Sequence, residues 1–424
     1  MTPNRLSART AAQAIAAKKL TAVELVEASL ARVAEREPTL QAWAFLDRDL
    51  ALKQARACDA EAPRGPLHGV PVGVKDIIDT ADMPTEHGSP MYKGNRPATD
   101  AACVALVRRA GGIILGKTVT TEFASSPPAR TRNPLNPDHT PGGSSSGTAA
   151  AVADFQVPIG FGTQTAGSVI RPAAYCGLVG FKPSYGTYAV SGMKILAHGV
   201  DTLGTLTRSV DDALLMWEVL HAAPAAAPRL RERPRIGLCH TPFWSEAQKP
   251  AIEAFETASR KLAGIGADLE IVEMPSWFET LREDHRVIAE YESARNTAFE
   301  CAPERFHLHS PTMQAARERG WRLTPERYTA ARLAQYRGQQ EFAALVAGFD
   351  ALLMPSAPGE APEGLATTGD PVFSRLTSLL HVPAICLTVM KGPRGLPVGI
   401  QFVGAVGSDR DLLELARRAE ACFA

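Results

Sequence analysis

Residues 102–118 read ACVALVRRAGGIILGKT, and this stretch indicates the fold class. The apolar residues of ACVALVRRA recur at helical spacing, and the pair Gly111-Gly112 is typical of a helix stop. Residues 113–115 then form a short apolar run typical of a buried strand. A second helical pattern runs from 47 to 62, ahead of a strand expected at 70–74. Because helix followed by strand recurs, we predict an α/β fold.

Residues 111–118 also satisfy the pattern G-x-x-x-x-G-K-[ST] of phosphate-binding loops. In such a loop a strand leads into a glycine-rich turn and then into a helix, whose N-terminal N–H groups face the phosphate. Here the helical pattern precedes the strand, and the four variable positions are largely apolar strand residues. The order of elements therefore argues against nucleotide binding.

The bulk composition excludes several classes of partner. The 424 residues carry 45 basic and 45 acidic side chains, a balance that does not favour nucleic acid. No apolar run reaches the roughly 18 residues of a membrane span, and the first twenty residues are typical of an amphipathic helix rather than a secretion signal. We expect a cytoplasmic protein without nucleic-acid or membrane partners.

The seven cysteines include no C-x-x-C pair, and the ten histidines show no H-x-x-x-H spacing. These patterns indicate neither a disulfide framework nor a zinc site. We therefore expect reduced, mostly buried thiols, and no metal or cofactor.

The chain is expected to form one domain over residues 1–424. Its core is predicted at 60–221 and 350–424, because apolar strand patterns near the C-terminus can rejoin the first sheet. Residues 222–234 resemble a surface linker, and residues 235–349 carry long helical patterns that predict a helical elaboration.

Two short serine motifs are poor candidates for a nucleophile. Residues 143–147 read GSSSG and fit G-x-S-x-G, but that motif needs a strand directly before the serine, and three prolines precede it here. Residues 191–194 read SGMK and fit S-x-x-K, a pattern short enough to arise by chance.

A better constellation combines one lysine with two serines. Lys75 ends the apolar stretch GVPVGVKD, Ser144 lies in TPGGSSSG, and Ser168 follows small residues in GTQTAGSVIRPA. A lysine at a strand end is usually solvated, and Gly-Ser clusters are usually linkers. Linkers, however, do not normally lie between apolar strands and an alanine-rich helix such as TAAAVA. We therefore interpret the three residues as a functional site.

These residues and their surroundings resemble the amidase signature family of serine hydrolases. The matching segments occur in the family's order: GVPVGVKDIIDT, GGIILGKTVTTEFA, TPGGSSSGTAAAVA, GTQTAGSVIRPAAYCGLVGFKPSYG, DTLGTLTRSVDD, DALLMPSAP and LPVGIQFVG. The resemblance implies a large, mixed, mostly parallel twisted sheet covered by helices on both faces. It also implies a homodimer that hydrolyses a small-molecule amide.

The resemblance also assigns the chemical roles. It implies that Ser168 is the nucleophile, that Ser144 lies on a cis peptide and relays protons, and that Lys75 is the base. Lysine is a base only when uncharged, which burial favours. The N–H groups of Thr165, Ala166, Gly167 and Ser168 are expected to form the oxyanion hole. Ala166 replaces a glycine common in the family, and Gln164 stands where an aspartate is common.

The substrate is less well defined by the sequence. Gly143 and Arg171 are expected to bind substrate, and Arg171 lies three residues after the nucleophile, as in malonamidase-type members. A guanidinium there can bind a substrate carboxylate; alternatively, it ties down the loop through backbone carbonyls.

Three functions remain open at this point. The first is a small-molecule amidase that also accepts esters or carbamates. The second is the glutaminase-type A subunit of a tRNA-dependent amidotransferase, and the third is a non-catalytic interaction subunit.

Overall fold

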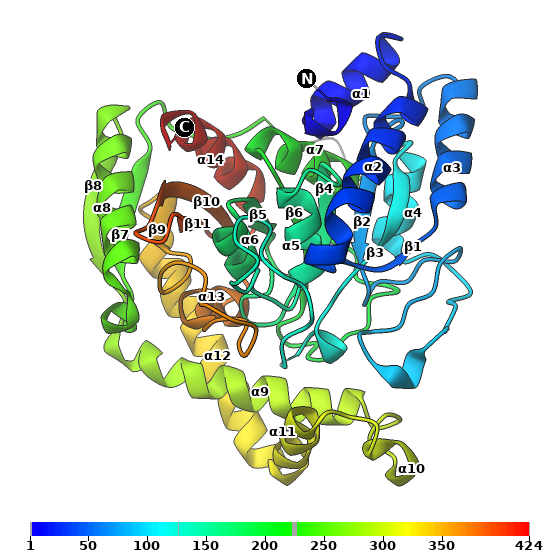
Figure 1. Ribbon diagram of the computed structural model, residues 1–424. Coiled ribbons are helices and arrows are strands. Elements are labelled where there is room, and N and C mark those ends of the chain that lie inside the picture. The colour runs from blue at the N-terminus through cyan, green and yellow to red at the C-terminus, as the bar shows by residue number, and fades with distance from the viewer. Residues whose placement is uncertain (1, 126, 223–226, 424) are drawn as a thin grey trace.

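A computed structural model describes residues 2–125, 127–222 and 227–423. Within these residues one sheet of eleven strands crosses the whole molecule, in the order β1-β3-β2-β4-β6-β5-β10-β11-β9-β7-β8 (Figure 1). The strands are β1 (Trp43–Leu46), β2 (Pro71–Lys75), β3 (Ile113–Thr118), β4 (Ile159–Gln164), β5 (Val179–Lys182), β6 (Thr202–Thr207), β7 (Arg235–His240), β8 (Asp268–Glu273), β9 (Ala351–Pro355), β10 (Ala384–Lys391) and β11 (Pro397–Val403).

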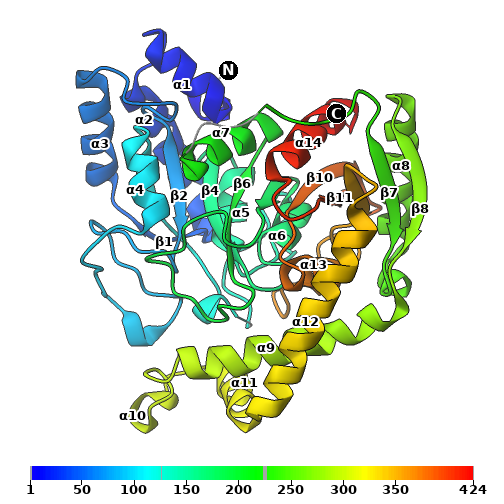
Figure 2. The same ribbon diagram turned by 180° about the vertical axis from the view of Figure 1, so that it is seen from behind.

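Helices cover both faces of this sheet, with α5 and α6 on one face and α7 and α14 on the other (Figures 1 and 2). Each face has its own cluster of buried apolar side chains. The helices are α1 (Ala8–Ala16), α2 (Ala22–Leu40), α3 (Arg48–Ala60), α4 (Ala102–Arg109), α5 (Ser146–Ala153), α6 (Ile170–Cys176), α7 (Val210–His221), α8 (Lys249–Gly264), α9 (Leu281–Asn296), α10 (Pro303–Phe306), α11 (Pro311–Arg322), α12 (Pro325–Val346), α13 (Val372–Leu379) and α14 (Asp409–Phe423). The predicted α/β fold is confirmed.

The sheet is mixed. Among its described strand pairs, six are antiparallel and four are parallel. Antiparallel pairing is thus more frequent than the resemblance implied. One cause is that β10 and β11 are joined by the short segment 392–396, and strands joined by so short a turn pair antiparallel.

The stretch at 102–118 folds as predicted. Helix α4 ends at Arg109, and Gly111 follows with φ of +87°, so the chain turns there into β3. A Cβ atom at Gly111 would lie 2.7 Å from the backbone of His68, which leaves no space for a side chain. Lys117 is fully buried and donates to Pro84 O at 3.1 Å and Thr85 Oγ1 at 2.5 Å. This lysine holds a neighbouring loop, and the motif binds no phosphate through it.

The region expected to be only helical contains two strands. Strand β7 pairs in parallel with both β9 and β8, which extends the sheet to its far edge. The apolar run of β7 is too short for its period to distinguish a strand from a helix. Strand β8 lies at the edge with most of its side chains exposed, so its sequence DLEIVE lacks a buried pattern. Residues 223–226 of the expected linker lie outside the described residues, and 227–233 are largely exposed without helix or strand.

Helices α9 to α11 lie beyond one end of the sheet, and α12 runs from there back towards β9 (Figure 2). Helix α9 packs against both α11 and α12. In residues 2–125, 127–222 and 227–423, no helix has both the length and the apolar composition needed to cross a bilayer. All seven cysteines are free thiols, and five of them are buried.

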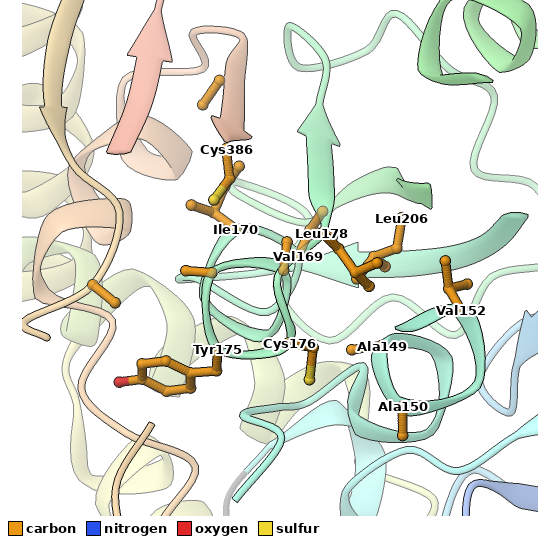
Figure 3. Packing of buried hydrophobic residues seen from close by; sticks show 14 of the residues in the cluster. Ala149, Ala150, Val152, Val169, Ile170, Tyr175, Cys176, Leu178, Leu206 and Cys386 are labelled. Carbon is orange, nitrogen blue, oxygen red and sulfur yellow. The ribbon is translucent and has the colours of Figure 1, made fainter. Parts of the chain in front are cut away.

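Helices α5 and α6 place the two loops that carry the candidate serines. The small side chains of α5 let it pack closely against α6 and β4, and Figure 3 shows Ala149 of α5 directed towards α6. Ser144 lies just before α5, and Ser168 lies just before α6. The contact between the helices therefore brings both serine loops to the same edge of the sheet.

Candidate active site

Lys75 is the last residue of β2, at the edge where the parallel neighbour β4 also ends. Its Nζ atom donates to Ser144 Oγ and to Thr163 Oγ1, each at 2.7 Å. The side chain is completely inaccessible to solvent. Thr163 was not among the predicted site residues. Thr163 lies near the end of β4, which pairs with β2. The sequence alone does not show that these two strands are neighbours, so it carried no signal for this residue.

Burial lowers the pKa of Lys75 to about 7, because a charged ammonium group is disfavoured away from water. Asp201 acts in the opposite direction, since its negative charge raises the lysine pKa. The Asp201 carboxylate accepts from Thr165 Oγ1 at 2.6 Å and from the backbone N–H groups of Leu196 and Ala197. Near neutral pH, a large fraction of Lys75 is therefore uncharged.

Ser144 and Ser168 line one cavity of about 470 Å³. The Gly143–Ser144 peptide bond is cis, as the resemblance implied. Ser168 is 7% exposed, and its hydroxyl has no hydrogen-bond partner among the described residues. The structure thus joins Lys75 to Ser144 directly and places Ser144 and Ser168 on the same cavity wall.

The segment Thr165–Ser168 connects β4 to α6, and its four backbone N–H groups are not used in hydrogen bonds within the described chain. Its carbonyl groups are held instead: His285 Nε2 lies 2.9 Å from Thr165 O, and Ser378 Oγ donates to Ala166 O at 3.2 Å. Ala166 does not adopt positive φ, so its methyl group causes no left-handed strain. Free N–H groups on a fixed loop are what an oxyanion hole requires.

Gln164 has a structural role at this loop. Its side-chain Oε1 atom accepts from the backbone N–H groups of Val169 at 3.0 Å and Ile170 at 3.1 Å. Its Nε2 atom donates to Ser378 Oγ at 3.1 Å. A neutral amide therefore satisfies the first N–H groups of α6, where the resemblance would have placed a carboxylate.

Arg171 connects two loops across the cavity. Its guanidinium donates to Gly143 O at 2.6 Å, to Gly369 O at 2.8 Å and to Thr368 Oγ1 at 3.1 Å. The side chain is 5% exposed, and burial lowers its pKa to about 10. Of the two interpretations made from the sequence, these contacts support the one in which Arg171 ties down the Gly143 loop.

Neither of the two short serine motifs supplies a nucleophile in the way that its pattern suggests. Ser145 follows an irregular segment rather than a strand, so no nucleophile elbow forms there. Lys194 forms an ion pair with Glu300, Ser191 is exposed, and neither residue lines the cavity. Within the described residues, no group of three or more His, Cys, Asp or Glu side chains is arranged to hold a metal ion.

Comparison with known proteins gives consistent results. A family model described as Amidase matches residues 24–413. The A subunit of glutamyl-tRNA(Gln) amidotransferase from Chloroflexus aurantiacus is 33% identical, over 96% of this chain and 94% of that protein. The protein of the same description from Anaeromyxobacter sp. (strain K) is 32% identical, over 98% of this chain and 96% of that protein.

Solved structures are also similar along nearly the whole chain. One described as an amidase superposes with a TM-score of 0.88 at 31% identity, covering 98% of this chain and 99% of that one. A peptide amidase from Stenotrophomonas maltophilia gives a TM-score of 0.82 at 28% identity, covering 98% of this chain and 96% of that one.

Proposed function

The chain belongs to the amidase family and is an amide-hydrolysing enzyme, and from this premise we propose that it cleaves its substrate through an acyl-enzyme on Ser168. The observation that carries the proposal is the buried contact of 2.7 Å between Lys75 Nζ and Ser144 Oγ, in the wall of the cavity that Ser168 also lines. A lysine whose pKa is near 7 can accept a proton at neutral pH.

In the proposed acylation step, Ser168 Oγ attacks the carbonyl carbon of the amide. The Ser168 proton passes to Ser144 Oγ while the Ser144 proton passes to Lys75 Nζ. The backbone N–H groups of residues 165–168 stabilise the oxyanion of the tetrahedral intermediate. Ser144 then donates a proton to the departing nitrogen and is reprotonated by Lys75. Water hydrolyses the acyl-enzyme by the same relay in reverse.

Arg171 supports this chemistry without touching the reacting atoms. By binding the carbonyl of Gly143 it fixes the loop that carries Ser144. By binding Gly369 it also fixes the opposite cavity wall. We infer that its role is to keep Ser144 in reach of both Lys75 and Ser168.

The similar proteins help to choose between a stand-alone amidase and an amidotransferase subunit. The curated relatives are subunits of glutamyl-tRNA(Gln) amidotransferase, so they support a glutaminase-type A subunit better than a stand-alone small-molecule amidase. Such a subunit would act together with partner proteins, whereas the resemblance implied a homodimer. A non-catalytic interaction subunit is disfavoured because Lys75, Ser144 and Ser168 are all present, with Lys75 bonded to Ser144 and both serines lining one cavity.

The test is release of ammonia by the purified chain from glutamine, a simple aliphatic amide and a peptide amide, with the mass of the particle measured in parallel. Turnover of simple amides by the chain alone supports a stand-alone amidase. Turnover confined to glutamine, with a monomeric particle, supports the A-subunit function. Equal ammonia release by wild type and Ser168→Ala would contradict the proposed role of Ser168.

A further inference from the structure

The cavity that Ser144 and Ser168 line has an unusual charge. Five arginines contribute to its wall, at positions 171, 286, 317, 319 and 375, and Glu290 is the one acidic residue that lines it in the described chain. A cavity lined by one sign of charge concentrates ligands of the opposite sign. An arginine of this wall can bind a ligand only if protein groups do not already occupy its donors.

Three of these arginines are occupied by protein groups. Arg286 Nη1 lies 2.7 Å from Glu290 Oε2, and Arg319 Nη2 lies 2.8 Å from Glu290 Oε1. Arg171 donates from its two Nη atoms to two backbone carbonyls and one hydroxyl, and only its Nε atom is buried without an acceptor. The single glutamate of the wall is thus already shared between two cations, and it forms no ion pair with either of the remaining arginines.

Arg375 and Arg317 each have one hydrogen-bond partner in the described chain, and in neither case is it a carboxylate. Arg375 Nη1 lies 3.2 Å from His285 Nδ1, and its Nε atom is buried without an acceptor. Arg317 is 2% exposed and donates from Nη1 to Ser293 Oγ at 2.6 Å, while its Nε and Nη2 atoms are buried without acceptors. Neither guanidinium forms an ion pair with any described carboxylate. The charge of Asp370 acts on Arg375, and the charges of Glu122, Glu290 and Glu300 act on Arg317, but none of these carboxylates is directly paired with the two guanidinium groups. A buried cation without a directly paired counter-charge is costly unless a ligand supplies one.

Arg375 is also close to the reacting loop. It lies on α13, whose start packs tightly on the nucleophile loop: a Cβ atom at Gly167 would lie 2.8 Å from Cβ of Pro371, the residue before the helix, and 3.2 Å from Cβ of Ser374. Its partner His285 contacts Thr165 O in the same loop. Burial and the Arg375 charge both lower the pKa of His285, to about 3, so this imidazole is neutral and provides no second cation.

We propose that the substrate amide carries a carboxylate, which Arg375 binds directly through its guanidinium while Arg317, which lines the same cavity, adds positive potential. This inference rests on the proposed function and specifies its substrate class. An arginine can donate two parallel hydrogen bonds to a carboxylate, which orients a small substrate as well as attracting it. Carboxylate-bearing amides are then preferred to neutral amides of the same shape.

The experiment compares succinamate with 4-oxopentanamide, a neutral amide in which an acetyl group replaces the carboxylate. We expect wild type to hydrolyse succinamate with a kcat/KM about tenfold or more above that of the neutral amide, as for a charge-assisted hydrogen bond. Arg375→Gln should remove this preference, with succinamate losing at least about tenfold and 4-oxopentanamide less than about threefold. Arg322→Gln is the matched control, since Arg322 is exposed on the helix that carries Arg317 and pairs with Glu318.

A second measurement uses succinate as a competitive inhibitor of wild-type hydrolysis of 4-oxopentanamide, with the neutral diamide succinamide for comparison. Stronger inhibition by succinate supports the inference even if Arg375→Gln does not fold. No preference for succinamate in wild type, or equal losses on both substrates in Arg375→Gln, would overturn it while leaving amide hydrolysis intact. Absence of hydrolysis of every amide, including those of the wider panel above, would instead overturn the proposed function and this inference with it.

Discussion

Lys75 Nζ lies 2.7 Å from Ser144 Oγ at a position that solvent does not reach. The contact depends on three separate parts of the chain. Strand β2 presents the lysine, the loop before α5 presents the serine, and Thr163 near the end of β4 accepts a second hydrogen bond from the same amine. Because the amine is buried among neutral hydroxyl groups, its protonation is set by burial and by the charge of Asp201.

The pH profile of amide hydrolysis should report this lysine. Its pKa of about 7 predicts that kcat/KM rises with pH through neutrality, as the ammonium group loses its proton and becomes a base. Asp201→Asn removes a charge that raises the lysine pKa, so the rising limb should move to lower pH. A profile for Asp201→Asn that is unchanged, or moved to higher pH, would contradict this electrostatic coupling.

Stability should also depend on Lys75 in a defined direction. Between pH 7 and about 10.5, the unfolded chain keeps this lysine protonated while the folded chain does not, so folding stability rises with pH in that window. Lys75→Met lacks this dependence. Urea unfolding should show the stability of the variant relative to wild type falling by about 2–3 kcal/mol from pH 6 to pH 9. If the difference in unfolding free energy between wild type and Lys75→Met is the same at both pH values, Lys75 is not neutral in the folded protein.

Gln164→Ala should destabilise the start of α6. The side-chain oxygen of Gln164 accepts from two backbone N–H groups, and alanine leaves both without that acceptor. The expected loss is about 1–3 kcal/mol in urea unfolding, together with lower kcat because the nucleophile loop is less well held. Gln13→Ala, at an exposed position of α1, is the control and should change stability by less than about 0.5 kcal/mol.

Arg171→Ala should lower kcat on every substrate. Both Nη atoms of the guanidinium donate to backbone carbonyls, of Gly143 and Gly369, so its loss frees the Ser144 loop whatever the charge of the substrate. We expect a loss of about 100-fold or more on both succinamate and 4-oxopentanamide, as for a misplaced catalytic group. A loss confined to succinamate would show that Arg171 itself binds the carboxylate.

The sequence predicted the elements with strong local signals. The helix stop at Gly111, the C-terminal strands and the cluster of Lys75 with the serine-rich loop all followed from local patterns or from a family resemblance. The strands β7 and β8 were missed, because one is too short for its period to be recognised and the other is an exposed edge. Thr163, Asp201 and His285 were also missed, since each reaches the site through strand order or through a helix more than a hundred residues away.

The hydrogen-bond partners of the cavity arginines also could not be predicted from local sequence. Arg171 attracted attention because it follows the nucleophile, yet its donors are used by carbonyl groups of two distant loops. Arg375 and Arg317 carry no motif, and the fact that each has only one hydrogen-bond partner becomes visible only when all five arginines of the cavity are compared. Charge balance inside a cavity depends on tertiary packing, which no sequence window contains.

The covalent intermediate provides the most direct test. Wild-type protein treated with a serine-reactive fluorophosphonate, digested with trypsin and analysed by mass spectrometry should carry the adduct on Ser168. Ser191→Ala, which alters an exposed serine outside the cavity, should be labelled equally, and Lys75→Met should be labelled far more slowly. Label found on Ser144 or on another residue, or unchanged labelling of Ser168→Ala, would contradict a nucleophile at position 168 that the buried lysine activates.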